Sequence, residues 1–303
     1  MKQILFLLAA LAAALPSLAL DAPIRTQEML SPVYSIEKKY RSMEGPSSFQ
    51  KVYLGDREKP ELLWITGVRT EMVGEDGSTP QLPELMCHVN VDLDSVKHQK
   101  LFGATRWVST RFMTLSQGML DARFPEGFAF PIASNEPLTV YTQVLNHNIE
   151  NPHIKVRHRV TFTYVRDRDL QKPLKALINV GASGTVLIPQ EPASMTASAA
   201  MPVKDAGGAH GMSCLMAPRA PNAAGMAGDY TDPQGHHLTG HWVVPPGRQV
   251  NHSDVTWFMS LPFDTKLHFA AMHLHPFAES IELRDVTANK VLFKANAQNP
   301  AKG

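Results

Sequence analysis

The chain has 303 residues, of which 44% are hydrophobic, and its 29 Lys and Arg nearly balance its 28 Asp and Glu. This length is typical of about two domains, and the balanced charge lacks the basic footprint of nucleic-acid-binding proteins, so we expect no nucleic-acid partner. The 2 Cys are too few for a disulfide scaffold or a Cys₄ zinc site, whereas 13 His and 14 Met supply ligands for copper or zinc.

Residues 1–20 have the order of a signal peptide. Lys2 precedes an apolar run from Ile4 to Leu15, and Pro16 and small residues lead to Ala19, near which we expect cleavage. The run is shorter than the roughly 20 residues of a membrane-spanning helix, and no later stretch is long enough. We therefore expect an exported protein, periplasmic or secreted, without a membrane span once the signal is removed. A Cys87–Cys214 disulfide is chemically permitted in that compartment.

The rest of the chain is dominated by short runs of alternating or β-branched residues, separated by Pro, Gly, Asn and Asp. We predict strands at Leu62–Val68, Met86–Leu93, Thr139–Val144, Val156–Val165, Ala176–Ile188, Val255–Leu261, Leu267–His275, Ser280–Leu283 and Val291–Lys294. Many short strands with such connections predict an all-β fold of antiparallel sandwiches or jelly rolls, with little helix.

The N-terminal half carries one candidate site, at Cys87 and His88 within the strand predicted at 86–93. Neighbouring residues of a strand point to opposite faces, unless a β-bulge lies between them. His147 and His158 follow later, and we predict that His88 faces inward toward the cleft between two domains and lies within reach of one of them. The sequence has no nucleophile elbow, phosphate loop, Rossmann fingerprint or zinc-protease helix motif.

Residues 191–238 interrupt the β pattern, because they begin with a long stretch rich in Ala, Gly, Pro and Met. We predict an irregular loop here. Its methionines are either incidental to a linker, or, with Met212, Cys214 and Met216 at every second position, they form a soft-ligand loop for Cu(I).

The strongest local signal is the His-x-His pair His273 and His275. On a strand, residues i and i+2 point to the same face, so both imidazoles can converge on one metal ion. His268 lies on the opposite face of such a strand and is a poor third ligand. His241 is on a separate segment that could pack alongside. The alternative is a solvated strand pair with no metal.

Three features of the C-terminal half resemble copper type II, ascorbate-dependent monooxygenases. They are the Val-Pro-Pro-Gly sequence at 244–247, the Met-His-Leu-His sequence at 272–275, and the strand after it that ends in Arg284. The family includes peptidylglycine α-hydroxylating monooxygenase, and the chain is most similar to its uncharacterised bacterial branch. The resemblance implies two tandem jelly-roll domains, at 21–170 and 171–303. Each domain of the family binds one copper ion, and the cleft between them binds substrate.

In the second domain, the resemblance assigns His273 and His275 to the copper ion that activates dioxygen. The family's third ligand there is a downstream methionine, but this chain has no methionine after Met272. Either the C-terminal strands are missing from this chain, or another residue takes that place. Met259, on the strand predicted at 255–261, is our candidate thioether, and His241 is our candidate additional ligand.

In the first domain, the family's adjacent histidine pair falls on Cys87 and His88. The remaining family ligand follows a Gln-Val dipeptide, where this chain has Leu145. His147 shares the face of that position and could replace it. Because the imidazoles are incomplete, Cys87 would make this a softer copper site.

Three function classes stay open at this point. The first is a copper-dependent monooxygenase that hydroxylates a C–H bond of a small molecule or peptide with dioxygen and ascorbate, using one or two copper ions. The second is an exported protein that binds or handles copper without turnover. The third is a metal-free β-sandwich that binds carbohydrate, peptide or another protein.

Overall fold

A computed structural model describes residues 22–40, 44–103, 109–188, 229–240, 242, 244–261, 263–275 and 277–298. The predicted signal peptide, Cys214 and His241 lie outside these residues. The prediction of an all-β protein is confirmed, because strands dominate and each helix in the described residues is short. Within the described part, no helix has the length and apolarity needed to cross a membrane.

Two sheets form a β-sandwich in the N-terminal half of the chain. The larger sheet has strand order β1-β10-β4-β8-β11, with β2 added beside β10 and β7 beside β4. Its strands are β1 (Arg25–Leu30), β2 (Tyr34–Ile36), β4 (Leu62–Gly74), β7 (Asp121–Arg123), β8 (Phe128–Ala133), β10 (Ile154–Arg166) and β11 (Lys175–Ala176). The pairs are antiparallel except β8 with β11. β11 belongs to this sheet although it follows residue 170, and the division into domains at 21–170 and 171–303 remains a prediction.

The second sheet has four antiparallel strands in the order β3-β9-β5-β6. They are β3 (Ser47–Val52), β9 (Leu138–Val144), β5 (Met86–Leu93) and β6 (Arg111–Leu115). The turn η1 (Pro83–Leu85) leads into β5, and helix α1 (Ser95–Phe102) follows it, capped by the Asp94 side chain and by Gly103 at φ 60°. The turn η2 (Asp167–Asp169) follows β10.

The main hydrophobic core lies between these two sheets. Alternate residues of each strand point inward, as Val89, Val91 and Leu93 do from β5 and Val156 and Val160 do from β10. The β-branched residues at these positions suit a pleated, buried surface. Consequently His88, Asn90 and Asp92, which alternate with the inward residues of β5, lie on the face of the second sheet that points away from the core.

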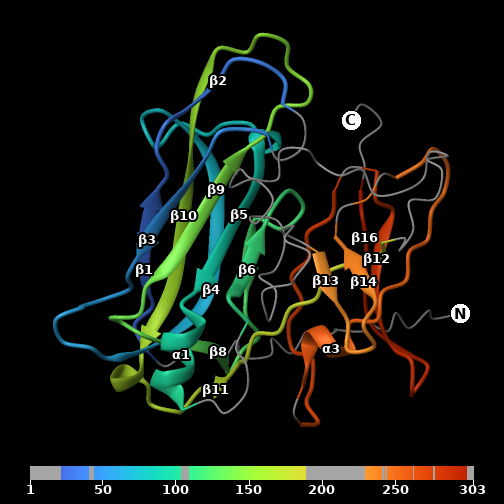
Figure 1. Cartoon of the computed structure of the whole chain (residues 1–303). Coiled ribbons are helices and arrows are strands. Elements are labelled where there is room, and N and C mark those ends of the chain that lie inside the picture. Colours follow the sequence, from blue (N-terminus) through green and yellow to red (C-terminus); the bar gives the residue numbers. More distant parts are fainter. Residues whose placement is uncertain are drawn as a thin grey trace, which may run out of the picture.

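The C-terminal elements form two smaller sheets, which lie beside the sandwich in orange and red (Figure 1). One has the order β12-β14-β13, with β12 (Val186–Leu187), β13 (Asp229–Thr231) and β14 (His237–Thr239); the other pairs β15 (Ser280–Asp285) with β16 (Lys290–Asn296). A one-turn helix, α3 (Thr256–Met259), lies between them in sequence. The tandem jelly-roll arrangement remains a prediction.

Several predictions for the second half are wrong. Only the ends of 176–188 are strands, and β13 and most of β14 fall within the predicted loop 191–238. Residues 255–261 contain α3, because the Asp254 carboxylate accepts a hydrogen bond from the Thr256 N–H and starts a helical turn. Residues 267–275 have no regular secondary structure. They contact the sandwich through side chains and lack the backbone ladder that defines a strand.

His158 is a buried histidine of the core, on β10 between the two sheets. Its ring packs edge-on against Tyr34, with 5.9 Å between centroids. Neither ring nitrogen meets a hydrogen-bond partner among the described residues. Burial lowers the pKa of His158 to about 3, and the nearby backbone of Gln143 raises it by less. The ring is therefore neutral at physiological pH.

Replacing His158 with leucine should make the protein less sensitive to acid. The unfolded chain binds a proton near the ordinary histidine pKa of 6.5, whereas the folded chain does so only near 3, so the wild type loses stability as pH falls through this window. Between pH 7 and pH 5 the loss from one such group is about 2 kcal/mol. Urea unfolding of both proteins at several pH values measures the difference. The exposed His147, replaced in the same way, is the control, and an unchanged pH dependence in His158→Leu would contradict the prediction.

Candidate metal centre

A β-bulge in β5 brings Cys87 and His88 together. Met86 pairs with Val144 and His88 pairs with Gln143, so Cys87 is the extra residue in the ladder. Both side chains are buried, with Cys87 8% and His88 0% exposed. The Cys87 Sγ lies 3.1 Å from the His88 Nδ1. The bulge thus places a thiol and an imidazole side by side, where regular alternation would separate them.

His88 belongs to a polar row on the outward face of the second sheet. Its ring stacks on Tyr141 of β9, with centroids 5.5 Å apart and an interplanar angle of 29°. Farther along β5, the Asn90 Oδ1 accepts a hydrogen bond of 2.7 Å from the Thr114 hydroxyl. The Arg111 guanidinium donates both to this hydroxyl and to the Asp92 carboxylate. These bonds fix the polar side chains beside His88.

His273 and His275 approach this face from the C-terminal half. Their Nε2 atoms are 3.2 Å apart, although the residues are not on a strand. The ring centroids of His273 and His275 are 4.8 Å apart, and those of His88 and His273 are 5.6 Å apart. His88 is fully buried, His273 is half-buried and His275 is exposed. Three imidazoles from distant parts of the sequence therefore meet at one place.

These distances are close to those around one metal ion. Two nitrogens that are each about 2.0 Å from a tetrahedral ion lie roughly 3.3 Å apart, and the centroids of their rings lie roughly 5 Å apart. His273 and His275 match this spacing, and His88 is near it. In the described residues, however, no group of three or more His, Cys, Asp or Glu side chains is already arranged to hold a metal ion. A shared ion would thus require His88 to reorient slightly toward the pair.

Both inner histidines of this cluster are held neutral. Burial is the main cause that lowers the pKa of His88 well below its ordinary value, and His273, Arg111, His158 and His275 add to it. Burial likewise lowers the pKa of His273 to about 4, with help from His275 and Arg111. Neutral imidazole is the form that binds a metal ion, so protons do not compete at physiological pH.

The hydrogen bonding of the second ring nitrogen of His273 differs from expectation. We expect the ring nitrogen that does not face the metal to be held by a carbonyl or carboxylate, which fixes the tautomer. The buried His273 Nδ1 has no hydrogen-bond partner among the described residues. The orientation of this ring therefore depends on its contacts with neighbouring rings.

Among the described residues, the other sequence candidates are not brought to this place. His147 is exposed in the loop after β9. His158 influences the pKa of His88, but it points into the core, on the other side of the second sheet. Met259 ends α3, so the expectation that it lies on a strand beside His273 is wrong. His241 and Cys214 lie outside the described residues, and the Cys87–Cys214 disulfide stays a prediction.

The sequence analysis missed Tyr141 and Arg111. Tyr141 is placed under His88 by the pairing of β5 with β9, and Arg111 by the pairing of β5 with β6. Neither pairing can be deduced from residue spacing alone. The alternation of His88, Asn90 and Asp92 on a strand was the one available signal of a buried polar face.

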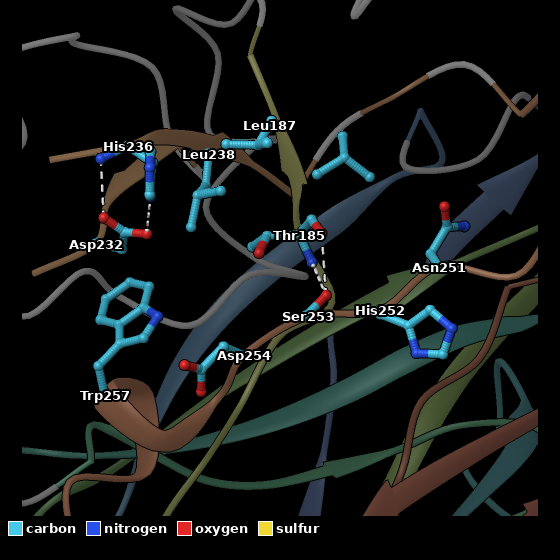
Figure 2. Close-up of a pocket in the computed structure, with 11 residues that line it drawn as sticks. Thr185, Leu187, Asp232, His236, Leu238, Asn251, His252, Ser253, Asp254 and Trp257 are labelled. Carbon is cyan, nitrogen blue, oxygen red and sulfur yellow. Dashed lines mark hydrogen bonds and ion pairs between the residues drawn. The ribbon is translucent and has the colours of Figure 1, made fainter. Parts of the chain in front are cut away.

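A separate pocket of about 350 Å³ lies among the C-terminal elements (Figure 2). Its polar side chains bond mainly to their surroundings. Asp232 accepts hydrogen bonds from the backbone and ring of His236, and Ser253 bonds to the backbone of Thr185. Asp254 caps α3. These hydrogen bonds organise the local loops.

Comparisons with known proteins do not assign this chain. No protein-family model matches it, and no curated protein matches it significantly. The functional conclusion therefore depends on the side chains described above.

Proposed function

We propose that the chain is an exported copper-binding protein with one copper centre, formed by His88, His273 and His275. The observation that carries this proposal is the spacing of the three rings, with 3.2 Å between the Nε2 atoms of His273 and His275 and 5.6 Å between the centroids of His88 and His273. Imidazole suits copper, and the neighbouring Cys87 thiol adds a soft donor that favours Cu(I). The sequence resemblance to copper monooxygenases supports the same metal.

The spacing favours one ion over two. The sequence resemblance implies one copper at His88 and another at the His273–His275 pair, separated by a cleft. Rings this close instead supply three ligands to a common ion, and dividing them would leave each ion with too few. Binding or delivering copper needs only one centre. Copper handling is therefore the function that the geometry supports best.

A copper-dependent monooxygenase is the second candidate. His275 is exposed, so the solvent side of the centre is accessible to dioxygen, a reductant and a substrate. If bound at this site, copper would supply the redox chemistry, while His88 and His273 hold it. Oxygen uptake that requires both ascorbate and copper would establish this candidate. Copper binding without such uptake would leave copper handling.

Copper titration tests the proposal directly. We expect one copper ion per chain, and replacement of both His273 and His275 by alanine should abolish binding while the fold is retained, because half-buried and exposed side chains contribute little to stability. The control is the same double replacement of His236 and His237, which are exposed and lie at the start of β14. Unchanged copper affinity in the His273/His275 variant would overturn the proposal.

A further inference from the structure

The segment 263–275 has little of its own structure to position its histidines. It has no regular secondary structure, and residues 263–268 are exposed. Its backbone makes no strand pairing with the sandwich within the described residues. The location of His273 and His275 must therefore be set by side-chain contacts elsewhere in the segment.

Two aromatic contacts attach this segment to the sandwich. The Phe269 ring meets Phe124 edge-to-face, with centroids 5.2 Å apart, and it packs against the main core. The preceding His268 ring lies on Phe128 of β8, with centroids 4.1 Å apart. We call these four residues the aromatic clasp.

The sandwich side of the clasp is rigid. The Phe124 N–H donates to the Thr66 carbonyl of β4, and the Phe124 ring contacts the buried Phe112 of β6 at 6.1 Å. Phe112 follows Arg111, which lies near both His88 and His273. β6 thus contributes a neighbour to each group, Phe112 to the clasp and Arg111 to the histidine cluster.

We propose that the aromatic clasp positions His273 and His275 opposite His88, with Phe269 as its main positioning residue. His273 is four positions after Phe269, a length that spans at most about 14 Å of extended chain. Anchoring Phe269 therefore confines the pair to a small volume near β5. This inference rests on the proposed copper function.

The effect is reciprocal by thermodynamic linkage. If docking of the segment favours copper binding, bound copper favours docking by the same factor. Copper joined to His88 and His273 thus fastens 263–275 to the sandwich. The clasp makes the first contact, and the ion completes the attachment.

Replacing Phe269 by alanine tests the inference, because it removes the anchor and touches no ligand. We expect the Cu(I) affinity, measured anaerobically by competition with a chelator, to fall about tenfold or more, while the circular dichroism spectrum is unchanged. Phe269→Leu should restore most of the affinity. The matched control is Phe263→Ala, since Phe263 is in the same segment but 53% exposed.

Hydrogen exchange supplies a readout that does not depend on affinity. In the wild type, Cu(I) should slow exchange of the backbone amides of 263–275, and in His88→Ala it should not. Suppose that the wild type binds Cu(I). If Phe269→Ala then keeps full Cu(I) affinity, or if Cu(I) leaves hydrogen exchange of 263–275 in the wild type unchanged, the role of the clasp is overturned and the proposed copper function is not. Absence of any Cu(I) binding by the wild type would overturn the proposed function and the clasp with it.

Discussion

Replacing His88 with alanine is expected to weaken copper binding by far more than 100-fold, although His88 and the His273–His275 pair belong to different halves of the chain. Loss of a mere hydrogen-bond partner of a metal ligand costs roughly 10- to 100-fold, and loss of one of three ligands costs more. With one shared centre, the wild type binds one ion and the variant retains only the weak two-imidazole pair. Isothermal titration with Cu(II), and chelator competition with Cu(I), measure both quantities.

The result separates one centre from two. If His88 served its own ion, the wild type would bind two ions and His88→Ala would still bind one with unchanged affinity at His273 and His275. Because His88 is fully buried, the alanine variant also creates a cavity, so His88→Gln is the companion that keeps most of the volume. His158→Leu is the control for a buried histidine that points away from the centre, and its copper affinity should equal that of the wild type.

Replacing Gly45 with alanine should cause the largest loss of stability, about 3 kcal/mol or more. A Cβ atom at this buried position would lie 1.9 Å from the Val144 carbonyl oxygen, which is backbone and cannot rotate away. The chain must therefore separate here from the end of β9. The Gly45 carbonyl also accepts a hydrogen bond from the Gln143 side chain, directly opposite His88. Urea unfolding should show the loss, and copper affinity should fall as well.

The matched control for Gly45 is Gly184. A Cβ atom there meets only the Trp242 ring, at an ordinary 3.9 Å, so Gly184→Ala should change the unfolding free energy by less than about 0.5 kcal/mol. Equal effects of the two substitutions would show that the close approach at Gly45 is relieved without cost.

The strands of the sandwich could be predicted because their residues carry the pattern of a half-buried strand. Met86–Leu93 is predicted and observed with identical bounds, and the strands predicted at 139–144 and 156–165 are each extended by one to three residues. The alternation of apolar and polar residues predicts the wrong element where other interactions determine the local structure. The run 255–261 has the apolar content of a strand, but it forms a helical turn, in which Trp257 and Phe258 stack on each other and the Thr256 N–H donates to the Asp254 carboxylate.

The candidate site was predictable only in part. The sequence singles out the His-x-His pair, and its role as a metal site stays a prediction; its geometry comes from a segment without strand structure, so the strand argument for it was wrong. The meeting of His88 with His273 is a long-range contact, and residue spacing contains no information about it. The bulge at Cys87 was foreseen only as an alternative, because a single extra residue leaves no mark in the sequence.

The contact between His88 and His273 also determines whether the chain folds before or after it binds a metal ion. His88 and His273 come together only when the chain folds, because closing so long a loop costs conformational entropy before their contact can stabilise it. A nascent or translocating chain therefore lacks this ligand set. If the chain is exported and binds copper as proposed, it would reach its destination without copper and fold before it binds the ion. Copper loading would then be a late, post-translational step.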